Sequence, residues 1–152
     1  MRNWKLIPIV VLSCALAIAQ THTPAQAENI VHKAMEYAKQ NGMAKLIEQT
    51  NQSDGRFHVG KGSDLYLFIY DQAGICLGMG FSPQGFVGVN RMSVKDQDGK
   101  QYIREFILLA KTKGNGWVDY KRLDPVTNKI ESKTSYVELY DDLVLGCGIY
   151  KP

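Results

Sequence analysis

Hydrophobic residues follow helical spacing in the first part of the chain and strand spacing in the second. Residues 28–41 place apolar side chains at every third or fourth position and charged side chains on the opposite side. This pattern predicts a helix that ends at Gly42, and residues 43–50 predict a second, shorter helix. Residues 51–64 are rich in glycine, serine and aspartate, which indicates a loop.

The period changes to two at residue 65. Residues 65–70 alternate aliphatic and aromatic side chains, so both faces are apolar and a central strand covered on both sides is predicted. The other predicted elements are a strand over 75–79, a loop over 80–90, a helix over 100–113 and strands over 117–122, 130–139 and 143–150. Five strands and three helices in this order predict an α+β fold, with one antiparallel sheet and helices on its faces.

The amino terminus has the order of a secretory signal peptide. A short basic start precedes an uncharged run over residues 6–19, and Ala25-Gln26-Ala27 supplies small residues at the −3 and −1 positions of a cleavage site. The run has 14 residues, whereas a membrane span needs about 20, which favours a leader over residues 1–27 rather than an uncleaved anchor. Ala17-Ile18-Ala19 is a second possible cut.

Removal of the leader changes the size and the charge of the protein. Residues 28–152 form a chain of 125 residues, which suits a single domain. The leader carries two of the 18 basic residues and none of the 15 acidic ones, which leaves 16 basic against 15 acidic residues. Such a near-neutral domain gives no electrostatic case for nucleic acid as a partner. After cleavage no stable membrane span is expected, and we expect a periplasmic or secreted protein.

Motifs for catalysis and metal binding are lacking in the sequence. His32 and His58, the histidines after residue 27, stand in no metal-ligand spacing with each other or with a cysteine. There is no nucleophile elbow and no phosphate loop. The stretch at 96–99 begins like a calcium loop but lacks the later glycine and glutamate, and we interpret it as a turn. The sequence therefore predicts a protein that is not an enzyme and has no cofactor.

Several motifs in a fixed order resemble the single Cache domain family. They are DLYLFIYD at 64–71, GVN at 88–90, DQDGK at 96–100, GNGWVDY at 114–120, DPVTNK at 124–129, KTSYV at 133–137 and GIY at 148–150. The resemblance covers nearly the whole chain after the leader. It implies a PAS-like sheet with a small-molecule pocket, usually the extracytoplasmic sensor of chemoreceptors and histidine kinases. Small carboxylates are the ligands that this resemblance implies.

Two cysteines, Cys76 and Cys147, follow the leader. In an oxidising compartment a pair suggests a disulfide, and the composition by itself leaves the bonded and free forms open. The resemblance implies the strand order 2-1-5-4-3, which places the two cysteines on opposite sides of the first strand. Their backbones would then lie about 10 Å apart, whereas a disulfide needs Cα atoms within about 7 Å. We therefore expect two free, buried thiols.

The ligand pocket is expected between the central sheet and a cover formed by the loop 80–90 and the helix 100–113. Lys133 would anchor a carboxylate, because a charge-assisted hydrogen bond contributes about 1.5–3 kcal/mol; the alternative is an exposed strand lysine. Tyr120 and Tyr136 would supply hydroxyl groups, or could be ordinary core aromatics. A regular strand points Lys133 and Tyr136 to opposite faces, so both reach the ligand only if a bulge intervenes. The apolar walls would be Phe68, Met79, Phe106 and Trp117.

Met79 departs from the family's pattern. Many standalone relatives have Ala-His-Gly where this chain has Gly78-Met79-Gly80, and a thioether neither donates a hydrogen bond nor titrates. Two functions therefore remain open. The first is a small-molecule binding protein that signals through a separate membrane receptor or kinase. The second is a ligand-free Cache-fold module that docks other proteins in the periplasm.

Overall fold

The structure, a computed structural model, describes residues 22–60 and 63–151. One five-stranded antiparallel sheet has the strand order β2-β1-β5-β4-β3, which confirms the predicted order and fold class. The strands are β1 (Leu67–Asp71), β2 (Cys76–Met79), β3 (Asn115–Leu123), β4 (Ile130–Tyr140) and β5 (Leu143–Tyr150). The helices are α1 (Pro24–Asn41), α2 (Met43–Asn51) and α3 (Tyr102–Lys113), with a short 3₁₀ turn at Pro83–Gly85.

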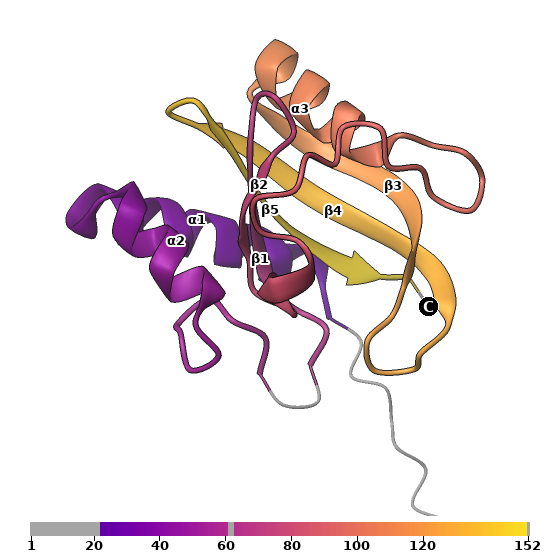
Figure 1. The fold of residues 1–152 in the computed structure, drawn as a ribbon, viewed down its shortest axis with the longest axis horizontal. Helices are drawn as coiled ribbons and strands as arrows, with labels where there is room; N and C mark the ends of the chain where they lie inside the picture. Colours follow the sequence, from indigo (N-terminus) through magenta and orange to yellow (C-terminus); the bar gives the residue numbers. More distant parts are fainter. Residues whose placement is uncertain (1–21, 61–62, 152) are drawn as a thin grey trace, which may run out of the picture.

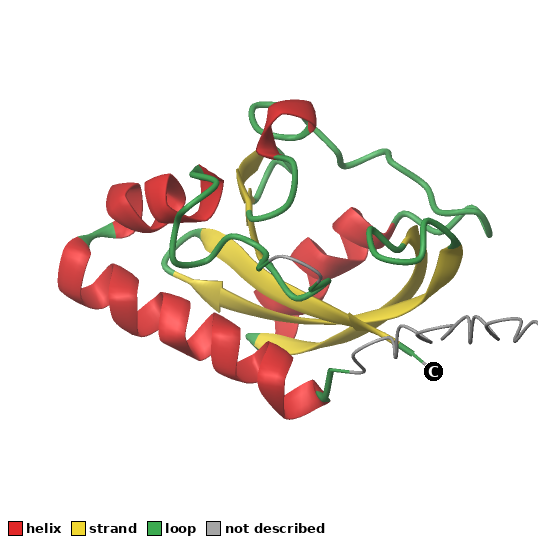
Figure 2. Cartoon of the chain, turned by 90° about the horizontal axis from the view of Figure 1, so that it is seen from below, coloured by secondary structure: helices red, strands yellow, loops and turns green. Residues whose placement is uncertain are grey.

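The sheet lies between two layers of helix (Figures 1 and 2). Helices α1 and α2 cover one face, and α3 crosses the other. Side chains in β1 alternate between the two faces of the sheet. Phe68 and Tyr70 face α3, Leu67 and Ile69 face α1, and all four are buried. The prediction of a central strand covered on both sides is confirmed.

Strand β5 occupies the middle of the sheet and carries glycines on the face toward α3. A Cβ atom on Gly146 would collide with the ring of Phe68, and one on Gly148 would collide with Ser135 Oγ and lie 2.6 Å from Cε of Lys133. Close approach of side chains to a strand backbone is a common reason for glycine in a strand interior. The two glycines thus make room for Phe68 and Lys133.

Helix α1 begins at Pro24, four residues before the predicted start. Thr23 is the N-cap, and it forms a capping box with Gln26 in which each side chain accepts a hydrogen bond from the other residue's backbone N–H. Pro24 occupies the first turn, where its missing N–H costs nothing. Residues 1–21 of the predicted leader lie outside the described residues.

The long connection from β2 to α3 is tied to the sheet by Asp96. Its carboxylate accepts backbone N–H groups of Asp98 (2.9 Å), Lys100 (2.8 Å) and, in β3, Lys121 (2.9 Å). Burial would raise the pKa of this carboxyl group, but the three N–H donors outweigh it and lower the pKa. The sequence 96–99 is thus the predicted turn, and it fixes the connection against the edge of the sheet.

Cys76 on β2 and Cys147 on β5 are buried free thiols on the two sides of β1. Burial raises the pKa of Cys76 to about 11 and that of Cys147 to about 12. In the part of the chain that the structure describes, no helix has the length and apolar character to cross a membrane.

Candidate ligand-binding site

Aromatic side chains from the sheet and from α3 meet on the α3 face of the sheet. Tyr102 of α3 stacks on Tyr120 of β3, with ring centroids 4.4 Å apart and planes 10° from parallel. Phe106 of α3 stacks on Phe68 of β1 at 5.3 Å and meets the edge of Tyr120 at 5.4 Å. Both geometries are favourable for aromatic pairs. The layer therefore has a defined packing and encloses a small cavity.

The cavity is lined by Tyr66, Phe68, Tyr70, Met79, Tyr102, Ile103, Phe106, Tyr120 and Arg122. Its volume of about 10 Å³ holds about one water molecule. A ligand with several heavy atoms fits only if the lining side chains move apart. Met79 suits such a movement, because its unbranched side chain has three rotatable bonds.

Arg122 brings a guanidinium group into this aromatic lining. It lies on β3 two residues after Tyr120, so both point to the same face of the sheet. Its Nη1 donates a hydrogen bond of 2.9 Å to Oη of Tyr102. Burial alone would lower the pKa of Arg122, but the surrounding tyrosine oxygens outweigh it and raise the pKa, so the group is a permanent cation.

Lys133 on β4 is a second cation beside the cavity, and only 1% of its surface is exposed. Its Nζ lies 4.5 Å from the ring centre of Tyr66 and 4.3 Å from that of Tyr150. A long hydrogen bond of 3.4 Å joins Nζ to Oη of Tyr66. Among the ion pairs of residues 22–60 and 63–151, none joins Lys133 or Arg122 to a carboxylate. Neither cation thus forms an ion pair with a described carboxylate, although the Lys133 charge acts to lower the pKa of the nearby Asp64 carboxyl group. A buried cation without a direct ion pair is costly, and an anion bound between the two would reduce that cost.

The hydroxyl group of Tyr66 is influenced by both cations. Burial would raise the pKa of this phenol, but the charges of Lys133 and Arg122 outweigh it and lower the pKa. The Tyr66 oxygen therefore lies where the surroundings favour negative charge. A ligand carboxylate placed here would be stabilised by the same two cations, with hydroxyl groups as further donors.

Four of the seven predicted site residues line this cavity, namely Phe68, Met79, Phe106 and Tyr120. Lys133 lies beside it and contacts the lining residue Tyr66. Tyr120 and Lys133 are cross-strand partners in the β3–β4 register, and Tyr120 Oη lies 2.9 Å from Ser135 Oγ. The alternative that Lys133 is an exposed strand lysine is wrong, because Gly148 lets its side chain lie on β5 beneath the aromatic layer.

Trp117 and Tyr136 must be removed from the predicted site. They are register partners on β3 and β4, and both pack on the face covered by α1. The Tyr136 hydroxyl donates a hydrogen bond of 2.7 Å to Oε2 of Glu138, and its ring meets the His32 ring edge-on at 5.8 Å. The register between β3 and β4 is continuous, so no bulge brings Tyr136 round to the face of Lys133.

Sequence reasoning missed Arg122 and the three tyrosines Tyr66, Tyr70 and Tyr102. The signal for Arg122 was present, because a residue two positions from Tyr120 in a strand shares its face. The same rule applied to Phe68 places Tyr66 and Tyr70 in the site. Tyr102 begins α3 and could be placed only once the orientation of the helix was known.

An open groove of about 310 Å³ adjoins the cavity, and Arg122 lines both. At the groove two guanidinium groups lie close to the ring of Phe86, that of Arg91 at 4.6 Å and that of Arg122 at 5.3 Å from its centre. Nε of Arg91 is buried and has no hydrogen-bond partner among the described residues. Two arginines and two lysines against one aspartate give this groove an excess of positive charge beside the cavity.

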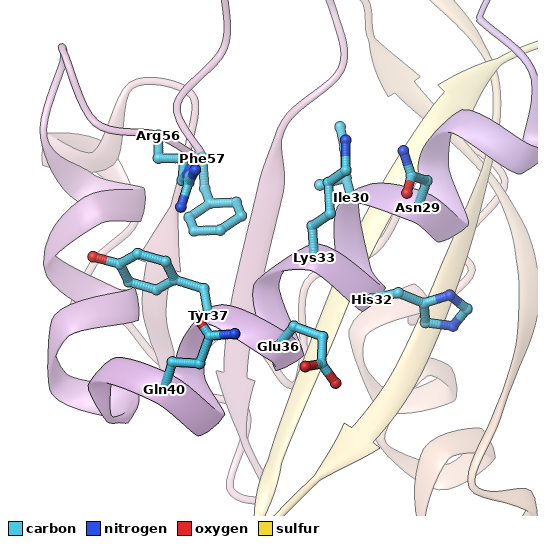
Figure 3. Close-up of a pocket in the computed structure, with 9 residues that line it drawn as sticks. All are labelled: Asn29, Ile30, His32, Lys33, Glu36, Tyr37, Gln40, Arg56 and Phe57. Carbon is cyan, nitrogen blue, oxygen red and sulfur yellow. The ribbon is translucent and has the colours of Figure 1, made fainter.

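A larger hollow of about 700 Å³ lies on the outer side of α1 (Figure 3). Phe57 and Arg56 border it, and the ring of Phe57 meets that of Tyr37 edge-on at 5.5 Å. The other side chains spread along the helix, and His32 points away from this aromatic pair (Figure 3). Because its polar groups do not converge, this hollow is a weaker candidate for a ligand than the cavity beneath α3.

No group of three or more His, Cys, Asp or Glu in the described ranges is close enough to hold a metal ion together. The groups that converge at the cavity are instead aromatic rings, hydroxyl donors and two cations. This set can bind an organic anion, and it contains no nucleophile–base pair of the kind that covalent catalysis uses.

The strand order and the helices on both faces of the sheet define a domain of PAS-like architecture. Residues 17–151 match the family described as Single Cache domain 2, and the chain belongs to this family. The family resemblance inferred from the motifs is thus confirmed. Cache domains are extracytoplasmic sensor domains that bind small molecules.

Solved structures share the fold at low sequence identity. A methyl-accepting chemotaxis protein from Vibrio parahaemolyticus RIMD 2210633 is 24% identical with a TM-score of 0.69, covering 83% of this chain and 86% of its own. A Cache chemosensory domain described for carboxylic acid recognition is 23% identical with a TM-score of 0.63, covering 84% and 88%. A periplasmic sensor domain of a chemotaxis protein is 22% identical with a TM-score of 0.62, covering 84% and 90%. Among curated proteins, none matches the chain.

Proposed function

We propose that this protein binds a small carboxylate in the cavity beneath α3, outside the cytoplasm, and reports it to a separate membrane receptor or kinase. The observation that carries the proposal is the pair of cations Arg122 and Lys133, which share Tyr66 and pair with no described carboxylate. A related Cache chemosensory domain described for carboxylic acid recognition supports the same ligand class.

The proposed ligand places its carboxylate at the Tyr66 hydroxyl and its short alkyl group among the rings. Tyr102 and Tyr120 lie near enough to supply hydroxyl donors once the lining opens. Because the closed cavity is about 10 Å³, acids of two or three carbons require the least movement. A ligand of four heavy atoms, such as acetate, gains at most about 6 kcal/mol, which corresponds to a dissociation constant of roughly 40 μM.

Calorimetry of the purified protein with acetate, propionate, pyruvate and lactate tests the proposal, with acetamide as the uncharged control. Arg122→Gln and Lys133→Met should each weaken the best acid more than tenfold, because each removes a charge-assisted hydrogen bond. The exposed residues Arg104 and Lys129 supply matched controls, so Arg104→Gln and Lys129→Met should bind as wild type does. Equal binding of acetate and acetamide, or unchanged affinity in both cavity variants, would refute the proposal.

The small volume of the closed cavity and Met79 in place of the family's usual histidine favour a second function. In that case the domain binds no metabolite and docks another protein in the periplasm, with a cavity that is simply part of the core. Met79→Ala separates the two functions, because a wider cavity should accept a longer acid such as butyrate if the site is a ligand pocket. No binding of any acid by wild type or by Met79→Ala favours the docking module.

A further inference from the structure

We propose that the signal peptide is removed after Ala19, so that the mature protein begins at Gln20 instead of Glu28. The inference rests on how the described residues 22–27 take part in the fold. It concerns export alone and does not depend on the ligand, so a failed ligand measurement leaves it standing. The two alternatives differ by the eight residues 20–27.

The first observation is the start of α1. Thr23 accepts the backbone N–H of Gln26 at 3.3 Å through Oγ1, and its own N–H donates to Oε1 of Gln26 at 2.7 Å. A cut after Ala27 removes both partners and leaves the helix without its cap. It also places the new α-ammonium group in the first turn, at the positive end of the helix dipole, where a cation is unfavourable.

The second observation is a buried contact between a histidine and a carboxylate before the helix. Nε2 of His22 lies 3.0 Å from Oδ1 of Asp64, and the two side chains are 8% and 11% exposed. Ser63 Oγ lies 3.3 Å from the same nitrogen. Burial raises the pKa of Asp64, and the nearby His22 partly offsets this. A cut after Ala27 would remove His22 and leave the buried Asp64 without this hydrogen-bond partner, which is destabilising.

The third observation is Ala27 itself. It has no exposed surface and packs in the core between α1 and the sheet, with Val31 and Ala34 on the next turns of the helix. Removal of Ala27 with the leader would take a buried residue out of the core of the folded domain. Residues 22–27 thus supply a helix cap, a buried contact to Asp64 and a core contact to the mature fold.

The sequence before His22 offers the alternative cut. Ala17 and Ala19 are small residues at the −3 and −1 positions, and the uncharged stretch 6–16 before them has 11 residues, within the usual length of a signal-peptide apolar region. Polar residues begin at Gln20. Positions 17–20 lie outside the described residues, so only their amino-acid sequence supports this cut.

The test is the intact mass of the protein exported from a bacterial host that expresses the full chain. A matched pair of substitutions at the two −3 positions, Ala17→Lys and Ala25→Lys, separates the two cuts. Ala25 is exposed on α1, so a lysine there leaves the core unchanged. Wild type and Ala25→Lys should both begin at Gln20 or its cyclised form, whereas Ala17→Lys should accumulate as precursor. Any other amino terminus in wild type, including Glu28 or intact Met1, would overturn the inference, as would precursor accumulation in Ala25→Lys.

Discussion

Replacement of Lys133 by methionine should make the protein more stable and less able to bind a carboxylate. Only 1% of the surface of Lys133 is exposed, and burying a charge costs several kcal/mol. The cation–π contacts with the rings of Tyr66 and Tyr150 stabilise the ammonium group by about 1–2 kcal/mol each. The 3.4 Å hydrogen bond to Tyr66 contributes less than about 1 kcal/mol. Methionine keeps the length of the side chain and needs no hydration. We expect Lys133→Met to gain about 1–2 kcal/mol in the free energy of unfolding.

Two measurements on the same samples check this expectation. Urea unfolding gives the free energy of unfolding, and a gain of 1–2 kcal/mol should raise the thermal midpoint by roughly 3–8 °C in a chain of this size. Calorimetry with acetate gives the affinity, which should fall more than tenfold. A gain in stability at the expense of binding is typical of a residue kept for function. A loss of more than about 1 kcal/mol in stability with unchanged acetate affinity would show that Lys133 is structural and refute the reasoning.

Three further predictions concern the support of the site. Asp96→Asn should lower the free energy of unfolding by about 1 kcal/mol at pH 7, since an amide nitrogen cannot accept a hydrogen bond from a backbone N–H. Because the pKa of Asp96 is lowered in the folded state, this loss of stability in urea unfolding should persist above about pH 4 and vanish at lower pH. A loss that stays constant down to pH 2 would contradict the prediction. Gly146→Ala should cost about 1–3 kcal/mol in thermal unfolding by displacing Phe68, whereas Gly85→Ala, with open space around it, should be neutral. Cys76 and Cys147 should react with a thiol reagent only after unfolding in urea, and rapid labelling of the native protein would show that their burial is incomplete.

The strands and helices were predictable because each buried face repeats with the period of its element. Strand β5 agrees with its predicted bounds, and α2 and α3 differ from theirs by one or two residues. The start of α1 was missed because Thr23-Pro24 was taken as the polar end of a leader. Threonine, proline and a glutamine three residues after the threonine are the sequence signs of a capped helix start. The end of a leader and the start of a helix were both possible for these residues, and the contacts to Asp64 and the core favour the helix start.

The site was only partly predictable because a resemblance indicates residues but not the faces on which they lie. Trp117 and Tyr120 are three positions apart on β3, so the alternation already places them on opposite sides. The same holds for Lys133 and Tyr136. Arg122 was missed because a strand arginine near a loop is ordinarily exposed, and its contact with Tyr102 depends on how α3 crosses the sheet. That crossing is a tertiary feature with no local pattern in the sequence.

The two glycines of β5 allow side chains from the α3 face of the sheet to pack directly against the backbone of this central strand. Phe68 and Lys133 lie directly against β5 at Gly146 and Gly148, where no glycine side chain separates them from the strand backbone. Cys147 and Ile149, on alternate positions of β5, pack toward α1. Strand β5 therefore contacts both layers of the domain, with Phe68 and Lys133 on its α3 face and the α1 layer on its other face.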